Sequence, residues 1–160
     1  MAAEPEPIDP EILNAYHRGT LTALLGARFV EATKDRLVAE LSIRDELLTV
    51  GGRVHGGTLM SLADLVGATG TFLNLPADAT GTTTLESKTN FFAGARGGLI
   101  RAEGTPIHRG RSTLADAHHR RGGSPSLSHH PDPDGVAWQF ELKGEALRRG
   151  LSRSERRGED

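Results

Sequence analysis

The longest apolar segment of the chain, residues 56–75, constrains the fold more than any other feature. Its apolar and small residues recur at helical spacing, at Leu59, Leu62, Ala63, Val66, Gly67, Thr69, Gly70 and Leu73. Polar positions are few, and a helix that is apolar on most sides is a buried helix. Gly67, Ala68 and Gly70 are small enough to let a sheet or a second subunit approach closely, and Pro76 ends the helix. The sequence therefore predicts a fold built around one central helix.

A second helix is predicted before it, over residues 10–25. Asp9 can cap this helix, and Pro10 suits its first position because a helix leaves that N–H unpaired in any case. Gly26 follows the last apolar residue, as expected at a helix end. The predicted fold thus begins with an N-terminal helix.

Strand patterns lie on both sides of the central helix. Residues 27–33 and 36–43 alternate between apolar and polar with a short turn between them, which predicts a β-hairpin. Residues 82–93 and 98–113 are predicted to form two longer strands joined by a turn at 94–97. The order of helix, two strands, buried helix and two strands predicts an α+β domain in which antiparallel strands surround the buried helix.

The composition excludes several classes of protein. With 160 residues, the chain is long enough for one domain with a real core. The formal net charge of -2 argues against a nucleic-acid partner, and the absence of cysteine excludes disulfides, thiolate metal sites and a cysteine nucleophile. Residues 1–10 lack the basic and apolar regions of a secretory signal, and no apolar run reaches the ~18 residues of a membrane span. A cytoplasmic location is therefore expected.

Two glycines at the start of the central helix, Gly56 and Gly57, form a candidate site for chemistry. The first backbone N–H groups of a helix have no partner within it, and the helix dipole is positive there. A carbonyl oxygen could come close to two glycines, so this helix end is a candidate oxyanion site. Asp64 follows Gly57 by about two helical turns and is expected on the same side, where a carboxylate can activate water or attack a carbonyl carbon itself. The alternatives are a plain loop-to-helix junction and a buried structural aspartate.

Residues 52–64 read Gly-Arg-Val-His-Gly-Gly-Thr-Leu-Met-Ser-Leu-Ala-Asp, and this run resembles a family signature. It is similar to the G-x-V-H-G-G run, short apolar stretch and L-x-D of the phenylacetate-pathway (PaaI-like) acyl-CoA thioesterases of the hotdog superfamily. Residues 83–92 resemble the next strand of that family, and residues 102–112 resemble the following strand with its basic-Gly-basic bend. The resemblance covers residues 10–114 and implies a hotdog fold, an antiparallel sheet wrapped around one long buried central helix.

The resemblance also implies roles for individual residues. Asp64 would be the general base or nucleophile, and the Gly57 N–H would bind the thioester oxygen. His55 would brace the turn and the substrate carbonyl, with packing alone as the alternative. Thr84 would orient the attacking water, with an ordinary strand threonine as the alternative. The implied reaction is hydrolysis of an acyl-CoA thioester to a free carboxylic acid and CoA.

Five further residues are candidates for binding the substrate or its CoA part: Gly56, Thr49, Asn90, Arg109 and Arg111. The two arginines could meet CoA phosphates as paired basic groups, and a solvated strand end is the alternative. Thr49 stands where many relatives carry an asparagine that helps to hold the carbonyl. The chain departs from the family pattern at that position.

The family's site lies across a dimer interface, so the resemblance implies a homodimer or homotetramer in which Gly57 and Asp64 come from different subunits. No metal or redox cofactor is implied, since CoA is part of the substrate. A non-catalytic hotdog protein that binds acyl-CoA or an acyl carrier is the main alternative, favoured by Thr49 and by the atypical tail. A hotdog dehydratase acting on hydroxyacyl thioesters is a further alternative, although such enzymes usually carry a differently spaced His–Asp or His–Glu pair.

The composition changes after Leu114. Residues 115–134 are rich in histidine, arginine and proline and form a poor strand, whereas the implied fold needs two more long strands. Degenerate codons for residues 115–120 and 129–134, read one nucleotide later, can encode alternating strand residues. We therefore hypothesise a reading-frame shift near Leu114, in the gene or in its recorded sequence, with a genuine divergent tail as the alternative. A product misfolded because of this tail is a further alternative to an active thioesterase. Resequencing tests this hypothesis, because an intact frame without a nearby slip contradicts it.

Residues 135–142 alternate again, and Trp138 and Phe140 are candidates for a replacement last strand. The histidine pairs at 118–119 and 129–130 predict no metal site, because adjacent histidines rarely converge on one ion. The predicted division of the chain is a disordered segment at 1–9, a single thioesterase domain at 10–143 and a charged disordered tail at 144–160.

Overall fold

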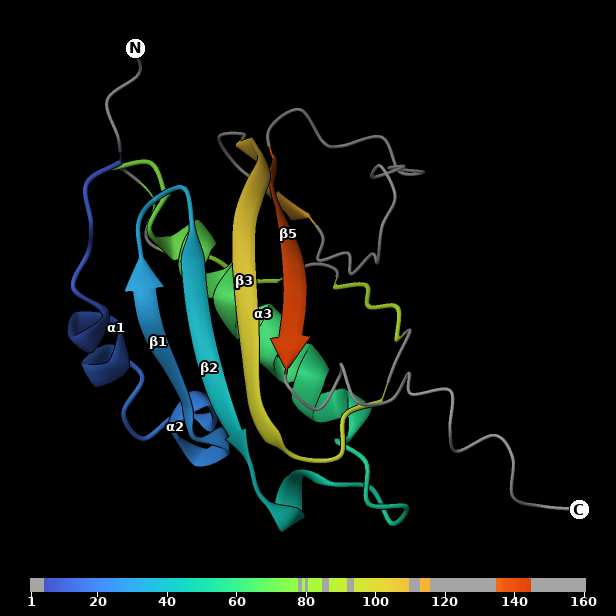
Figure 1. The fold of residues 1–160 in the computed structure, drawn as a ribbon. Helices are drawn as coiled ribbons and strands as arrows, with labels where there is room; N and C mark the ends of the chain where they lie inside the picture. Colours follow the sequence, from blue (N-terminus) through green and yellow to red (C-terminus); the bar gives the residue numbers. More distant parts are fainter. Residues whose placement is uncertain are drawn as a thin grey trace, which may run out of the picture.

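A five-stranded sheet curves around one long helix in the computed structural model (Figure 1). The strands are ordered β1-β2-β3-β5-β4 across the sheet, and the helix α3 (Gly56–Phe72) lies against one face. The strand bounds are Ala27–Ala32 for β1, Leu37–Ile43 for β2, Gly98–Arg109 for β3, Thr113–Ala115 for β4 and Gly135–Gly144 for β5. The structure describes residues 5–77, 79, 81–84, 87–91, 94–109, 113–115 and 135–144.

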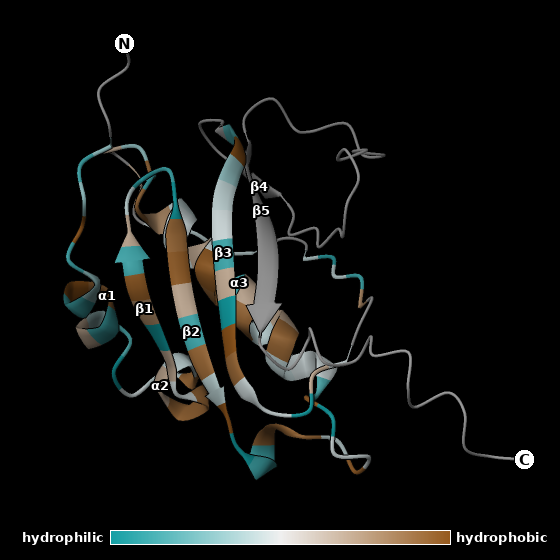
Figure 2. Cartoon of the chain, viewed as in Figure 1, coloured by the Kyte–Doolittle hydropathy of each residue, from teal (hydrophilic) through white to brown (hydrophobic). Residues whose placement is uncertain are grey.

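The central helix is buried against the sheet, as its apolar sequence predicts. Leu62 and Val66 of α3 have no exposed surface, and they belong to the same apolar cluster as Leu37 and Leu41 of β2 and Ile100 of β3. Each fully buried aliphatic side chain of this kind stabilises the fold by roughly 1.5–3 kcal/mol. Figure 2 shows this arrangement as hydrophobic residues along α3 and along β2 in front of it. The core therefore holds α3 in one place, and with it the residues at its start.

The N-terminal helix is broken in two, which corrects the prediction of one helix over residues 10–25. The structure has α1 (Pro10–Tyr16) and α2 (Leu21–Leu25) at the β1 edge of the sheet (Figure 1). The break falls at Gly19, whose φ of 74° is incompatible with a right-handed helix. The predicted ends are confirmed, because the Asp9 side chain accepts from the Glu11 N–H at 2.9 Å and Gly26 ends α2 with a φ of 81°.

The predicted hairpin is confirmed by the antiparallel pairing of β1 with β2, from Ala27 opposite Leu41 to Ala32 opposite Leu37.

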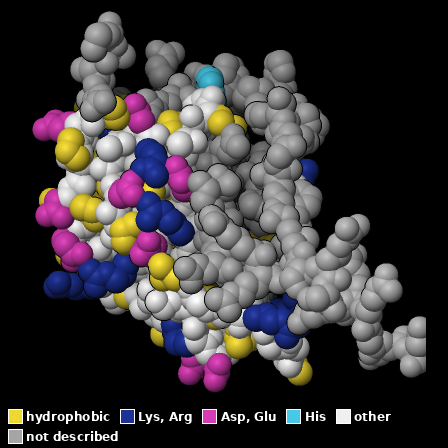
Figure 3. All heavy atoms as spheres, viewed as in Figure 1, with side chains coloured by type: hydrophobic (Ala, Val, Ile, Leu, Met, Phe, Trp, Pro, Cys, Tyr) yellow, Lys and Arg dark blue, Asp and Glu magenta, His cyan; other side chains and the backbone are white. Residues whose placement is uncertain are grey.

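The outer face of the sheet carries a network of ion pairs, visible in Figure 3 as neighbouring basic and acidic side chains. Arg36 pairs with Glu103 at 2.7 Å and also with Glu31, and Arg101 pairs with Glu31 and Glu40. The hydrogen bond from Arg36 is the largest cause of a lowered pKa at Glu31, and the hydrogen bond to Glu103 raises the pKa of Arg36.

The second half of the sheet differs from the prediction. The described residues between 81 and 91 belong to no strand, although residues 82–93 were predicted to form one. A strand needs a neighbour for its N–H and C=O groups, and the free edge of β5 is instead taken by β4, which runs parallel to it. The predicted strand over 98–113 is also divided, since β3 ends at Arg109 and Thr113 begins β4.

The candidate replacement strand is confirmed. β5 pairs antiparallel with β3, with Trp138 opposite Pro106 and Phe140 opposite Gly104. Residues 1–4, 116–134 and 145–160 lie outside the described residues. The predictions of a disordered start, an atypical segment and a charged tail therefore stay predictions.

Candidate active site

His55 forms the N-cap of α3 and closes the turn that leads into the helix. Its φ of -64° and ψ of 134° are extended, and its ring Nδ1 accepts a hydrogen bond of 2.9 Å from the Gly57 N–H. The His55 backbone N–H donates to the Leu47 carbonyl at 2.8 Å, and the His55 carbonyl accepts from Thr58 at 3.0 Å. The side chain and backbone of His55 thus fix the direction in which the first N–H groups of α3 point.

The His55 ring leaves little room for a side chain at position 57. A Cβ atom at Gly57 would lie 3.0 Å from His55 Nδ1 and 3.2 Å from Cε1, closer than such atoms normally approach. The ring also engages the Gly57 N–H, the group that the resemblance assigns to the thioester oxygen. A substrate oxygen can therefore take this N–H to itself only when the His55 ring turns away from it.

Glycine at position 56 accommodates a second ring. A Cβ atom at Gly56 would lie 3.3 Å from Phe91 Cζ, and 3.6 Å and 3.7 Å from Cε2 and Cε1. The tip of the Phe91 ring therefore stands over the first residue of α3, while 51% of the residue is exposed. Phe91 is not among the residues predicted for the site, because no local pattern shows that residue 91 returns to residue 56.

Asp64 lies on α3 among buried neighbours, but it is itself only partly buried. The Thr84 hydroxyl donates a hydrogen bond of 2.9 Å to Asp64 Oδ1. The two residues that the resemblance implies for catalysis and for positioning the water are thus in contact. The hydrogen bond holds one carboxylate oxygen and leaves Oδ2 to act on a water molecule or a carbonyl carbon.

Gly57 and Asp64 of one helix lie on the same side but far apart. Seven residues at a rise of 1.5 Å separate them by about 10.5 Å along the axis, and helical N–H groups point toward the N-terminus, away from Asp64. A carbonyl oxygen bound at the Gly57 N–H is then about three times too far from Asp64 of the same chain for direct attack, which needs about 3–3.5 Å. On this estimate from helix geometry, the two groups of one chain do not meet at one substrate carbon.

The other predicted binding residues are spread over the chain. Thr49 is exposed in the loop before α3, where its backbone N–H donates to the Arg53 carbonyl at 2.6 Å. Asn90 is partly buried and directly precedes Phe91, so it lies near the start of α3. The backbone hydrogen bond from Val54 to Ala95, 2.7 Å long, fixes the loop before α3 beside the residues that lead into β3.

The structure does not bring Arg109 to the start of α3 within one chain. Arg109 ends β3, and Gly98 begins it. At about 3.3 Å per residue the strand separates them by about 36 Å, and the start of α3 lies at the Gly98 end. Arg111 lies outside the described residues. A role for either arginine toward CoA therefore needs a second subunit or stays a prediction.

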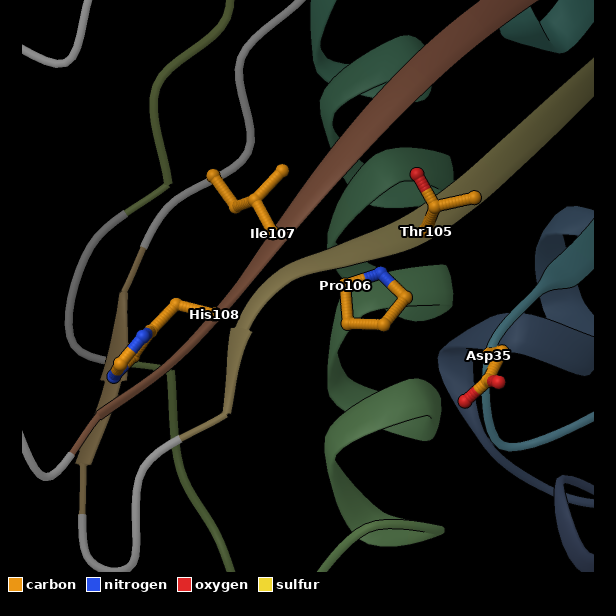
Figure 4. A pocket seen from close by; sticks show the side chains of 5 residues that line it. All are labelled: Asp35, Thr105, Pro106, Ile107 and His108. Atoms are coloured by element: carbon orange, nitrogen blue, oxygen red, sulfur yellow. The ribbon is translucent and has the colours of Figure 1, made fainter. Parts of the chain in front are cut away.

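A shallow hollow lies at the opposite end of β3 from the start of α3 (Figure 4). It is lined by Asp35, Thr105, Pro106, Ile107 and His108. None of these residues belongs to the predicted site, and the hollow is open to solvent over most of its extent.

Within the described ranges, no group of three or more His, Cys, Asp or Glu side chains is placed to hold a metal ion. No helix in the described part of the chain is both long and apolar enough to cross a membrane.

Comparison with known proteins places this geometry in a family. The family model of the thioesterase superfamily matches residues 51–115, which include His55, Gly57, Asp64 and Thr84. A Deinococcus radiodurans protein classed as a candidate esterase is 30% identical over 117 residues, covering 68% of this chain and 73% of that protein. The chain belongs to the thioesterase superfamily. The implied family and the general reaction, hydrolysis by a thioesterase-type enzyme, are thus supported by both comparisons.

Solved structures of other thioesterases share the fold of this superfamily member. A mutant of the thioesterase PA1618 from Pseudomonas aeruginosa superposes with a TM-score of 0.69 at 25% identity, covering 86% of this chain and 84% of that chain. The thioesterase HI1161 from Haemophilus influenzae also gives a TM-score of 0.69, at 20% identity, with 89% and 84% covered. The hotdog fold that the resemblance implies is therefore confirmed for this thioesterase-superfamily chain.

Proposed function

We propose that this chain hydrolyses acyl-CoA thioesters to a free carboxylic acid and CoA, with Asp64 as the general base or nucleophile. The observation that carries the proposal is the hydrogen bond of 2.9 Å from Thr84 Oγ1 to Asp64 Oδ1 on the accessible side of the buried helix. A carboxylate held in this way has one oxygen fixed by the hydrogen bond and a second oxygen, Oδ2, for the reaction. This arrangement suits a group that acts on a water or a carbonyl carbon.

As a general base, Asp64 Oδ2 would take a proton from water while the water oxygen attacks the thioester carbon. The carbonyl π electrons move to the carbonyl oxygen, which the N–H groups at the start of α3 would stabilise. Collapse of the tetrahedral intermediate breaks the C–S bond, and the CoA thiolate recovers the proton. As a nucleophile, Asp64 would instead attack the thioester carbon and expel the CoA thiolate, which forms an acyl anhydride. Water then hydrolyses the anhydride, restores the carboxylate and supplies the proton that the thiolate takes up. Both routes end in the same products.

The proposal includes a homodimer or homotetramer, in which Gly57 of one copy and Asp64 of another act on one substrate. It is supported by the separation of about 10.5 Å between these residues along a single α3, estimated from helix geometry. A second helix placed beside the first brings the two groups together. A monomer would then lack activity. We keep the cytoplasm as the predicted location.

The experiment is a thiol-release assay with short, long and aromatic acyl-CoAs, using the wild type and Asp64→Asn. Asparagine keeps the size of the side chain but can neither accept a proton as a base nor attack, so release is expected to fall at least about a thousandfold. Asp45→Asn is the matched control, because Asp45 is an exposed aspartate at the start of a 3₁₀ turn outside the site. An Asp64→Asn variant that keeps the wild-type rate would refute the proposal.

One observation favours a second candidate, a protein that binds acyl-CoA or an acyl carrier without turnover. The Gly57 N–H is already engaged by His55 Nδ1, so the oxyanion position is closed in this structure. A binder would show tight acyl-CoA binding by calorimetry with no thiol release from the wild type. A dehydratase would also release no thiol but would convert a hydroxyacyl-CoA to an enoyl-CoA, so product analysis with that substrate separates it from the binder.

A further inference from the structure

The ring of Phe91 lies against the first residue of α3. Its three outermost carbons are the atoms nearest to a Cβ at Gly56, at 3.3–3.7 Å. The absence of a side chain at Gly56 lets the ring stand on end against the helix backbone. The two glycines therefore leave room for two rings, that of Phe91 over Gly56 and that of His55 over Gly57.

Phe91 and Thr84 belong to one segment that runs back along α3. Thr84 contacts Asp64, two turns into the helix, and Phe91 contacts Gly56 at its start. The segment therefore lies on the side of α3 that carries both halves of the proposed chemistry. A carbonyl placed at the first N–H groups of α3 would therefore have the Phe91 ring near it.

Half of the Phe91 residue faces solvent, at 51% exposure, although burial of a phenylalanine side chain stabilises a protein. An exposed apolar ring next to a candidate oxyanion position can contact the acyl group attached to the carbonyl carbon and limit its size. We propose that Phe91 is a specificity-determining residue that limits the bulk of the acyl group next to the thioester carbonyl. The inference rests on the proposed acyl-CoA hydrolysis and names which part of the substrate this residue selects.

The test compares kcat/KM for a slim substrate, acetyl-CoA, with that for a bulky one, 2,2-dimethylpropanoyl-CoA. Removing the ring in Phe91→Ala makes room for a bulky acyl group. The kcat/KM for the bulky substrate, divided by that for the slim one, is therefore expected to rise about tenfold or more, which is the effect of one or two methylene groups in a pocket. Enlarging the ring in Phe91→Trp is expected to lower the ratio. Circular dichroism and thermal melting check that each variant is folded.

Phe72→Ala is the matched control, because Phe72 is also a half-exposed phenylalanine, at 45%, but at the opposite end of α3. There it stacks on Tyr16 with ring centroids 5.5 Å apart, and it lies about 24 Å along the helix axis from Gly56. Its ratio is expected to match the wild type. A similar rise in Phe72→Ala would show a general loosening of the helix and would overturn the inference.

Gly56→Ala supplies a second readout. The new Cβ at 3.3 Å pushes the Phe91 ring aside, so the ratio should change in the wild-type background and not in Phe91→Ala. If Phe91→Ala is active and its ratio of bulky to slim kcat/KM stays within about twofold of the wild-type ratio, the inference is wrong but the proposed function stands. An equal change in KM for all substrates would also contradict the inference, because it would place the ring against CoA. A wild type that releases no thiol from any substrate overturns the proposed function as well.

Discussion

Thr84 Oγ1 donates a hydrogen bond of 2.9 Å to Asp64 Oδ1, joining the segment after the central helix to the middle of that helix. The bond helps to hold this segment in place, because the described residues of the segment form no strand with the sheet. It also holds Oδ1 of the carboxylate against this segment. The same contact therefore positions both the segment and the proposed catalytic oxygen.

Thr84→Val is expected to lower kcat about tenfold with little change in KM. Valine keeps the shape of threonine and removes the hydroxyl, and one hydrogen bond of this kind contributes about 0.5–1.5 kcal/mol. Steady-state thiol release measures the effect, and Thr84→Ser should restore most of the rate because it returns the donor. Thr83→Val is the control at an exposed neighbouring threonine. A loss as large in Thr84→Ser as in Thr84→Val would show that the hydroxyl is not what matters.

The His55 cap and the absence of a side chain at Gly57 are expected to depend on each other. His55→Ala should lower the free energy of unfolding by about 1 kcal/mol, the usual effect of losing an N-cap. In a Gly57→Ala background the same change should cost much less, because the new Cβ has already displaced the ring from 3.0 Å. Urea unfolding of the four proteins gives the coupling.

Gly97→Ala provides the control background for that cycle. A Cβ at Gly97 meets no atom within 4 Å, so His55→Ala should keep its full cost there. Equal costs of His55→Ala in all three backgrounds would mean that the hydrogen bond from Gly57 to His55 does not stabilise the helix.

The sequence predicted the elements whose pattern is local. The central helix, the first hairpin and the caps at Asp9 and Gly26 are set by short-range periodicity and by single residues, and the structure has them. The predicted strand over residues 82–93 failed because a strand depends on a neighbour that local periodicity does not specify. Phe91 was missed for the same reason, since its contact with Gly56 joins residues 35 positions apart.

The separation between Gly57 and Asp64 shows what spacing alone can and cannot predict. A spacing of seven residues correctly indicates one side of the helix, and the resemblance adds the roles. The length of that spacing, about 10.5 Å, is the reason we propose that a second chain completes the site. The engagement of the Gly57 N–H by His55 could not be read from the sequence, because it depends on the rotamer of the ring.

Stability is expected to fall as the pH drops below about 6.5, in part because of His17. Burial lowers the pKa of His17 from its ordinary value of 6.5, and its ring nitrogens lie 3.2 Å from Thr69 Oγ1 and 3.4 Å from Thr22 Oγ1. The folded state therefore binds a proton less readily than the unfolded chain. The stability is fully present above the unfolded pKa and is lost as the pH falls toward the folded one.

Urea unfolding of the wild type and of His17→Gln between pH 5 and 8 measures this contribution. Glutamine keeps hydrogen-bonding capacity without a titrating ring, so the variant should lose less stability than the wild type over the range from pH 7 to pH 5. Parallel curves for the two proteins would assign the pH dependence to other groups.

The strand β5 is expected to be necessary for folding, while the residues after it are not. β5 pairs with β3 from Arg109 opposite Val136 to Ile100 opposite Gly144, so a chain that stops at Ala115 leaves that edge of β3 without its partner. An exposed sheet edge of this length promotes aggregation. A chain that stops at Gly144 keeps every described strand, so its melting temperature should stay within a few degrees of that of the full chain. Gel filtration and thermal melting of both truncations decide the point, since a cooperative, monodisperse product from the chain ending at Ala115 would show that β5 is dispensable.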